Sequence, residues 1–359
     1  MDEEEKLEGQ SLYYSHRHFE LIGSSAVSVI SLGVMLRCEA LTLRFDPLYL
    51  SDTISGSMPI DAVIERLVSH GCPNISSRLD AAQCNEFPIS RGGFGDVYQG
   101  ALLGGTKVAL KCFRFYVNER EAKELTLKHA ARELYTWSKC RHPNVVELLG
   151  LAEFRGQIAM VSPWMASGGI DQLNRSNRTI DRCRLCFQIA QGLAYLHETG
   201  VVHGDLKGAN VLLSDNEDAQ IADFGNAVLA SNTLAFTESA TRFGLSLRWA
   251  APELLEGKAS YNRQADIYSL GMEVISRQMP YADLRSEAGV MRAILQQQYP
   301  KRPEDRIPMF SKQGDNLWSL LEACWSWDPN GRPEAPSIVK VVGTFQSPDL
   351  IPDPISSSA

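Results

Sequence analysis

Long apolar runs are missing from this sequence. Residues 21–36 form an uncharged, mostly apolar stretch, but it is 16 residues long and is interrupted by serines and two glycines. A membrane-spanning helix needs about 20 apolar residues. A signal peptide begins with basic residues, whereas residues 2–5 are acidic. We therefore expect residues 21–36 to pack as a helix or a strand pair, with membrane association through them as the alternative.

Basic tracts are missing as well. The chain of 359 residues carries 35 Lys and Arg against 43 Asp and Glu, a formal net charge of −8, and no basic cluster is interleaved with aromatic residues. Nucleic-acid binding depends on neutralising phosphates with Lys and Arg, so a nucleic-acid partner is disfavoured. With 44% apolar residues, the chain is long enough for one globular domain of two lobes or for two small domains.

The cysteines have no pattern that would support a disulfide framework or a zinc site. Eight cysteines are scattered along the chain, and Cys183 and Cys186 form a single closely spaced pair. Zinc sites of this spacing need a second pair, which the sequence lacks. We expect these two thiols to be small apolar groups on one face of a helix. Scattered free thiols fit a reducing compartment, so the expected location is cytoplasmic.

The most informative stretch is 201–212, where a carboxylate, an ammonium and an amide lie two and three residues apart. Asp205 can accept a proton or orient a hydroxyl, Lys207 can neutralise a phosphoryl oxygen, and Asn210 can ligate a cation. A second carboxylate, Asp223, follows 13 residues after Asn210. A polar loop after a helix is the alternative, but the joint spacing of these four groups favours phosphoryl-transfer chemistry.

Upstream, residues 87–100 have the pattern of a strand, a glycine-rich hairpin and a second strand. Glycines in such a hairpin let backbone N–H groups approach a phosphate closely. Phe94 would cover the tip of the hairpin, and Val97 would cover a nucleotide base. A plain β-turn is the alternative when this stretch is taken alone. The glycines concerned are Gly92, Gly93 and Gly95.

Lys111 ends an apolar strand, 16 residues after Gly95. A charged residue in this position needs an anionic partner, and two are available in principle: nucleotide phosphates and a carboxylate on the helix that follows. That helix is predicted over residues 119–139, because the segment is rich in Ala, Glu, Lys and Leu. It carries Glu133, for which a solvated surface charge is the alternative.

Four more segments have a clear local character. Residues 142–150 form a turn that leads into a strand, and residues 158–161 form a strand that ends at Ser162. Residues 166–169 are small and polar, which favours a flexible connection. Apolar residues recur every three or four positions over 185–196, which predicts a buried helix directly before the stretch 201–212.

Taken together, residues 85–345 resemble a protein kinase catalytic domain in nearly every recurring motif. The motifs at 248–253 and 324–333 are similar to those of the tyrosine-kinase-like branch, and the form of 203–210 is similar to kinases expanded in basidiomycete fungi. The resemblance implies an α+β, bilobal protein kinase fold. Its expected parts are an extension over 1–84 that is partly helical, a β-rich N-lobe over 85–162 with one main helix, a hinge over 163–169, a larger helical C-lobe over 170–345 and a disordered tail over 346–359.

The resemblance also implies an activity: transfer of the γ-phosphate of ATP to a protein substrate, with Mg²⁺. It assigns Asp205 to orient the substrate hydroxyl and Lys207 to steady the γ-phosphate. It assigns Asn210 and Asp223 to magnesium. Lys111 would hold the α- and β-phosphates, oriented by Glu133. The other nucleotide-binding positions that it assigns are Ser90, Gly92, Gly93, Phe94, Gly95, Val97, Ala109, Ser162 as a small gatekeeper, Met165 in the hinge and Leu212.

Three further charged residues have structural roles by the same resemblance. Asp266, at the start of an apolar helix, would hold the backbone of the catalytic loop. Glu253 and Arg332 would form a buried pair, and such a pair is structural because losing one side leaves an unpaired charge. The segment between Asp223 and residue 248 is rich in Ser and Thr, as expected of an activation loop, although any polar surface loop carries hydroxyls.

Two residues favour Ser/Thr over Tyr as the acceptor. Lys207, two residues after the catalytic aspartate, is the form typical of Ser/Thr kinases. Ser246 stands where such kinases keep the hydroxyl that contacts the aspartate and the lysine. Arg248 is a contrary hint, because it resembles the tyrosine-kinase pattern.

The main departure from the family is Gly204, where most kinases carry an arginine that pairs with an activation-loop phosphate. Glycine cannot form that pair, so we expect that phosphorylation at Thr237 or Thr241 does not switch the protein on through position 204. Ser90 in place of a glycine is a milder departure. These two departures support the alternative of a pseudokinase or interaction module that retains nucleotide binding.

The segment before the resemblance contains one clear element. Over residues 59–70 apolar residues recur with a 3.6-residue repeat, acidic residues come early, and Gly71 follows. We expect a short amphipathic helix that packs on a neighbour, with docking of a partner through residues 59–70 as the alternative.

Overall fold

The computed structural model describes residues 53–91, 95–113, 120–173, 181–230, 235–236, 244–273, 279–304, 307–309 and 311–345. The stretch 21–36, the hairpin residues Gly92, Gly93 and Phe94, and the tail over 346–359 lie outside these ranges. Within them, no helix is both long and apolar enough to cross a membrane.

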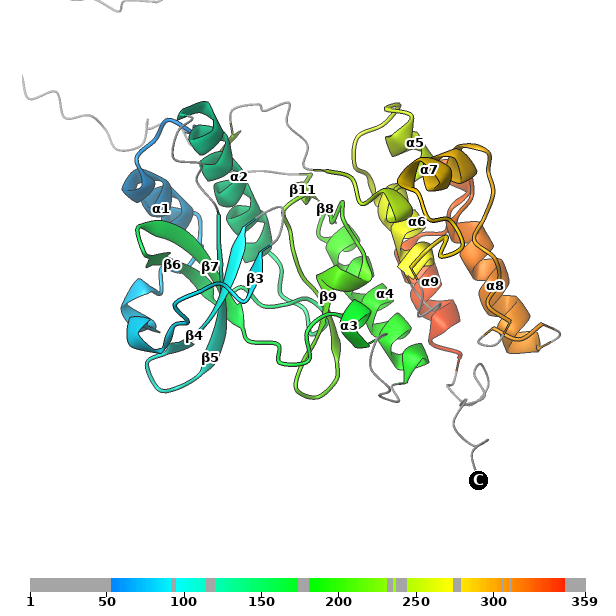
Figure 1. Cartoon of the computed structure of the whole chain (residues 1–359), viewed down its shortest axis with the longest axis horizontal. Helices are drawn as coiled ribbons and strands as arrows, with labels where there is room; N and C mark the ends of the chain where they lie inside the picture. The colour runs from blue at the N-terminus through cyan, green and yellow to red at the C-terminus, as the bar shows by residue number, and fades with distance from the viewer. Residues whose placement is uncertain are drawn as a thin grey trace, which may run out of the picture. The chain divides into compact units, whose positions relative to one another are not determined.

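The predicted β-rich lobe is built on an antiparallel sheet with the strand order β2-β4-β5-β7-β6 (Figure 1). In addition, β3 pairs with the first two residues of β4. Successive residues of a strand point to opposite faces. On β7, Ile158 and Met160 therefore join the large apolar cluster around helix α2, whereas Ala159 and Val161 join a smaller cluster on the other face. The strands are β2 (Leu79–Asp80), β3 (Ser90–Arg91), β4 (Asp96–Leu102), β5 (Lys107–Cys112), β6 (Gly150–Phe154) and β7 (Gln157–Pro163).

Helix α2 (Arg120–Ser138) is the one long helix of this lobe among the described residues, close to the predicted range 119–139. Its apolar residues Ala130, Leu134 and Trp137 are buried, as the helical repeat predicts. On β5 the residues with even numbers are buried in the smaller cluster, so Ala109 and Lys111 face the other side, toward the helical lobe.

The second lobe is mainly helical, as expected, and carries two short antiparallel pairs, β9 with β10 and β8 with β11. Helix α4 is the buried helix predicted over 185–196; Asp181 caps its first turn by accepting from the backbone N–H of Arg184. The helices are α3 (Ile170–Leu173), α4 (Arg182–Glu198), α5 (Pro252–Leu255), α6 (Arg263–Glu273), α7 (Glu287–Leu295), α8 (Lys312–Cys324) and α9 (Ala335–Val342), and the strands are β8 (Val201–Val202), β9 (Val211–Leu213), β10 (Ala219–Ile221) and β11 (Val228–Leu229).

Part of the expected N-terminal extension packs in one compact unit with the predicted kinase domain. The compact unit that contains both lobes begins at Ser51. It includes strand β2, which pairs with β4, strand β1 (Thr53–Ile54) and helix α1 (Ile60–Ser69), the helix predicted over 59–70. Ile54, Val63 and Leu67 are completely buried, so this part of the extension belongs to the core of the catalytic unit. The sequence did not reveal this because two-residue strands leave no periodic pattern.

Candidate active site

Three charged side chains from three separate elements meet between the lobes. The Nζ of Lys111 on β5 donates to Glu133 Oε1 on α2 and to Asp223 Oδ1, both at 2.7 Å. Asp223 is 112 residues away from Lys111 in the chain. The predicted contact between Lys111 and Glu133 is therefore present, and the interpretation of Glu133 as a solvated surface charge is wrong, because its side chain is 1% exposed.

This cluster shifts the pKa of each of its members. Burial by itself would lower the pKa of Lys111, but the carboxylates of Asp223 and Glu133 outweigh it and raise that pKa. Burial raises the pKa of Glu133, and Lys111 opposes the rise. The pKa of Asp223 is lowered, because Lys111 outweighs burial. Lys111 is therefore a permanent cation at physiological pH.

The catalytic-loop residues form a second cluster. The Nζ of Lys207 donates to Asp205 Oδ2 at 2.6 Å and to the hydroxyl of Ser246 at 2.7 Å. The amide nitrogen of Asn210 also donates to Asp205 Oδ2, at 3.0 Å. Both bonds to the Asp205 carboxylate use Oδ2, so its Oδ1 is the oxygen that remains to accept a proton from an incoming hydroxyl.

The backbone of this loop is hydrogen-bonded to a side chain of helix α6. Asp266 accepts from the backbone N–H of His203 and of Gly204, each at 2.8 Å, and lies 2.9 Å from the ring of His197. The predicted role of Asp266 is confirmed by these bonds. Gly204 has φ +77°, and a Cβ there would lie 2.7 Å from the carbonyl oxygen of Asn226. A glycine suits this position because a side chain would be strained and obstructed.

Four of the predicted nucleotide-binding residues lie on strands, and the strand pairings place them relative to Lys111 and the hinge. Val97 is opposite Lys111 in the β4–β5 pair, and Ala109 is opposite Ser162 in the β5–β7 pair. Leu212, on β9, comes from the helical lobe, where it bridges to the hinge residue Gly169.

The remaining predicted positions divide into described and undescribed residues. Ser90 is exposed and pairs with Val97, and Gly95 is required at its position because a Cβ would lie 2.4 Å from the carbonyl oxygen of Cys112. Met165 is partly buried and packs on the main apolar cluster. Gly92, Gly93 and Phe94 lie outside the described residues.

Two oxygen ligands fit a magnesium ion between the clusters. Asn210 donates through its amide nitrogen to the backbone and side chain of Asp205, which leaves its amide oxygen for a cation. Asp223 uses Oδ1 for Lys111, which leaves Oδ2. The described residues contain no group of three or more His, Cys, Asp or Glu that would hold a metal by itself. Mg²⁺ suits this poorer set, because it is usually held by one or two carboxylates together with substrate phosphates and water.

Sequence reasoning missed Glu273, which lies at the end of α6 beneath the catalytic loop. Its Oε2 accepts from the indole N–H of Trp249 at 2.8 Å, and its carboxylate also accepts from the backbone N–H of Gly208. Burial raises the pKa of Glu273 to about 7. It thus joins the catalytic loop to the segment that follows the activation loop. The available signal was a second acidic residue, after Asp266, in the same helix.

Arg248 and the pair formed by Glu253 and Arg332 belong to the scaffold. Arg332 makes a two-pronged contact with Glu253 at 2.7 and 2.8 Å, so the predicted pair is confirmed. Arg248 is buried and donates to Glu287 and to backbone carbonyls after α6, so it does not face the catalytic loop. Its value as a hint of tyrosine specificity is correspondingly small.

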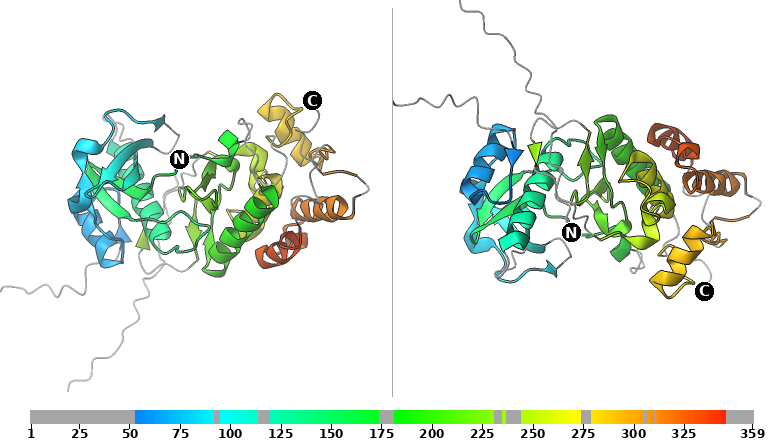
Figure 2. Two further views of the ribbon diagram at one scale, coloured as in Figure 1. Left: turned by 90° about the horizontal axis from the view of Figure 1, so that it is seen from below. Right: turned by 90° about the horizontal axis from the view of Figure 1, so that it is seen from above.

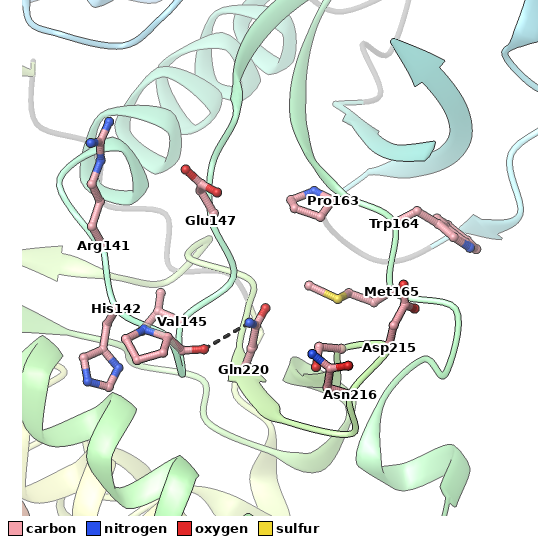
Figure 3. Close-up of a pocket in the computed structure, with 12 residues that line it drawn as sticks. Arg141, His142, Val145, Glu147, Pro163, Trp164, Met165, Asp215, Asn216 and Gln220 are labelled. Carbon is pink, nitrogen blue, oxygen red and sulfur yellow. Dashed lines mark hydrogen bonds between the residues drawn. The ribbon is translucent and has the colours of Figure 1, made fainter. Parts of the chain in front are cut away.

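A pocket of about 510 Å³ lies at the hinge, between the α2–β6 connection and the β9–β10 turn (Figure 3). One wall carries His142, Val145 and Gln220, and the amide of Gln220 donates to the carbonyl of Pro143 at 3.0 Å. The other wall carries Trp164 and Met165 (Figure 3). Of the predicted site residues only Met165 lines this pocket, so it is separate from the clusters around Lys111 and Asp205.

The comparisons with known proteins agree with this geometry. Residues 86–342 match the family model described as the protein kinase domain. The chain is 29% identical over 262 residues to the serine/threonine-protein kinase STY46 of Arabidopsis thaliana, which covers 70% of this chain and 42% of that protein. It is 28% identical over 267 residues to STY17 of the same plant, which covers 72% and 43%.

A yeast relative extends the range of organisms. The serine/threonine-protein kinase BCK1/SLK1/SSP31 of Saccharomyces cerevisiae is 29% identical over 256 residues, which are 69% of this chain and 17% of that protein. The matches thus span less than half the length of these relatives. Because the family model covers well over half of the sequence and the fold and charged clusters are those expected, the chain belongs to the protein kinase domain family.

Proposed function

We propose that this chain transfers the γ-phosphoryl group of ATP to Ser and Thr hydroxyls of proteins. The observation that carries the proposal is the arrangement of Asp205, Lys207 and Ser246, with one oxygen of Asp205 held by Lys207 and Asn210 and the other left for a hydroxyl. The names of the curated relatives, serine/threonine-protein kinases, support the same acceptor class.

The chain's own residues would divide the work as follows. Asp205 orients the acceptor hydroxyl and takes its proton, and Lys207 neutralises charge on the transferred phosphoryl group. Lys111, held by Glu133, pairs with the α- and β-phosphates. Asn210 and Asp223 would hold magnesium, which would neutralise charge on the phosphates. Val97, Ala109 and Leu212 enclose the base, and the backbone at Met165 supplies hydrogen bonds to it.

Finer features of the proposal concern branch, regulation and location. We assign the chain to the tyrosine-kinase-like branch on the motif at 248–253, and we infer a similarity to kinases expanded in basidiomycete fungi from the motif at 203–210. Gly204 offers no charge for a phosphate, so activation through a contact at position 204 is not part of the mechanism. The described free cysteines, which are buried or partly buried, support a reducing, cytoplasmic location.

Labelled ATP and magnesium test the proposal with the full chain and a generic basic protein as acceptor. The matched variants are Asp205→Asn and Asp283→Asn, the latter a half-exposed carboxylate in a surface pair with Lys301. Label on Ser and Thr that is lost in Asp205→Asn and kept in Asp283→Asn is the expected result. Label mainly on Tyr would overturn the acceptor class. Binding of ATP without transfer by the wild-type chain would favour a pseudokinase.

A further inference from the structure

Residues 53–75 precede the part of the chain that matches the family, yet several of their apolar side chains lie in the core. Ile54, Val63 and Leu67 are 0% exposed and Cys72 is 1% exposed. They belong to the same apolar cluster as Leu127, Ala131 and Leu134 of helix α2. Figures 1 and 2 show the blue segment that contains α1 next to α2, and the two helices are in contact.

The segment contacts the side of α2 that is turned away from Glu133. A helix turns by about 100° per residue, so Glu124, Tyr135 and Lys139 lie about 180°, 200° and 240° around the helix from Glu133. The Nζ of Lys139 donates to the backbone carbonyl of His70 at 2.6 Å. The rings of His70 and Tyr135 lie 6.2 Å apart, edge to face.

Gly56 makes the closest approach to α2. A Cβ at Gly56 would lie 2.1 Å from the carbonyl oxygen of Glu124, so the backbone of the segment rests directly on the backbone of the helix. Even one added methyl group would force the helix or the segment to move, because a Cβ does not approach an oxygen so closely.

The other end of the segment is attached to the sheet. The backbone N–H of Leu151 on β6 donates to the carbonyl of Pro73, and the N–H of Ile75 donates to the carbonyl of Leu151, both at 2.8 Å. Within the segment, Arg66 on α1 donates to the carbonyl of Thr53. The segment is thus hydrogen-bonded to β6 and packs on the face of α2 that lies opposite Glu133.

The same segment also contacts the stretch between Asp223 and residue 248, where the activation loop is expected. Strand β1 pairs in parallel with β12 (Ala235–Phe236), with Thr53 opposite Ala235 and Ile54 opposite Phe236. β12 lies between Asp223 and Ser246 in the chain. The segment therefore contacts two parts of the chain whose positions determine the geometry of the active site.

We propose that residues 53–75 are a positioning element of the catalytic site, which holds α2 so that Glu133 reaches Lys111. This rests on the proposed phosphotransferase activity for its effect on rate, but the placement of α2 can be measured without it. The role is one of positioning, because no residue of the segment contacts the reacting groups. On this proposal the apolar face of the helix over 59–70 packs on α2 of the same chain. An external partner that binds the same face would have to displace α2 from it.

Two test variants of the full chain, each with a matched control, test this proposal. Leu67→Asp places a charge in the contact with α2, and Val68→Asp, on a neighbouring residue that is 43% exposed, is its control. Gly56→Ala is the milder probe, with the exposed Ser57→Ala as control. Hydrogen exchange of the amides in α2 and in α9 is measured together with kcat/KM. We expect faster exchange in α2 but not in α9 for both test variants, and a rate lower by about 10²-fold, as for a small misplacement.

Combination with Glu133→Gln separates positioning from stability. If the segment acts through Glu133, adding Leu67→Asp to Glu133→Gln lowers kcat/KM by less than about twofold, whereas independent effects multiply. Multiplied losses, or unchanged exchange in α2 in both test variants, would overturn the proposal. Faster exchange in α2 with normal activity would overturn it too. Two results together would separate the proposals. If the wild-type chain transfers no phosphate, the proposed function is refuted. If hydrogen exchange in α2 is nevertheless faster in the test variants, the role of the segment in placing α2 still holds.

Discussion

Two buried groups of charged residues in this protein have nearly identical contact distances, but they differ in how completely their carboxylate oxygens are hydrogen-bonded. In the scaffold pair, Arg332 bonds both oxygens of Glu253 and also donates to the carbonyls of Ser326 and Gln264. In the catalytic cluster, Lys111 is shared between Glu133 and Asp223. The second oxygen of Glu133 is buried without a hydrogen-bond partner among the described residues.

The difference shows how the fold separates stability from chemistry. The scaffold pair is neutral and its carboxylate is fully bonded, which is what compensates for the cost of burying charge. The catalytic cluster has two carboxylates and one ammonium, so it carries excess negative charge and unbonded oxygens. Such a site favours the binding of a cation and its phosphate ligands. We therefore expect changes in the first group to affect folding and changes in the second to affect activity.

The largest effect is expected from breaking the scaffold pair. Arg332→Leu should lower the free energy of unfolding by about 3–5 kcal/mol, because Glu253 would be left as a buried, unpaired charge. Urea unfolding measures the change. The double variant Arg332→Leu with Glu253→Leu should recover much of the loss. Equal losses in the single and double variants would show that the charge imbalance is not the cause.

Lys111→Met tests the other side of the comparison. Removing the ammonium should reduce kcat/KM for phosphate transfer by about 10²- to 10³-fold, as when one group that stabilises developing charge is lost. The free energy of unfolding should change less than in Arg332→Leu, because the two carboxylates can retain protons at this site. Steady-state kinetics measure kcat/KM and urea unfolding measures the free energy of unfolding, both on the same preparation. A loss of stability as large as that of Arg332→Leu would contradict the proposed separation.

Gly204→Ala probes the backbone that carries the catalytic loop. The positive φ and the short approach to the carbonyl of Asn226 predict a loss of about 1–3 kcal/mol in the free energy of unfolding. Gly104→Ala is the control, because Gly104 has φ +104° and open space around its Cβ position. Its loss should be smaller, since only the backbone conformation opposes the change. The idea fails if the two variants unfold at the same urea concentration.

The smallest effect concerns Glu273, a partly buried carboxylate with neutral hydrogen-bond partners. Its pKa in the folded protein is raised from 4.5 to about 7, so the folded state holds this proton more tightly than the unfolded state. Its contribution to stability is complete below pH 4.5 and is lost as the pH rises through about 7. Glu273→Gln should flatten the dependence of stability on pH in this window. Unfolding curves of both proteins at several pH values measure it, and parallel dependences would refute it.

Several elements could be predicted because they leave a local pattern. The apolar repeat of α4, the acidic start of α1 and the composition of α2 each predicted a helix close to its observed bounds. The contacts of Lys111 with Glu133 and of Glu253 with Arg332 followed from motif resemblance, although each joins distant residues. The place of β2 in the sheet, and the packing of residues before 85 with the lobes, could not be predicted, because a two-residue strand is defined by its partner.

The candidate catalytic residues and their order could be predicted from the sequence itself, since spacing along a short loop is retained when the loop folds. Asp205, Lys207 and Asn210 lie within six residues, so their mutual geometry depends mainly on local backbone. Only the tertiary structure decided that the segment 53–75 supports α2 opposite Glu133, and that β1 pairs with β12 about 180 residues later. Such contacts depend on the packing of whole elements, and burial on one side of a helix does not specify which segment covers it.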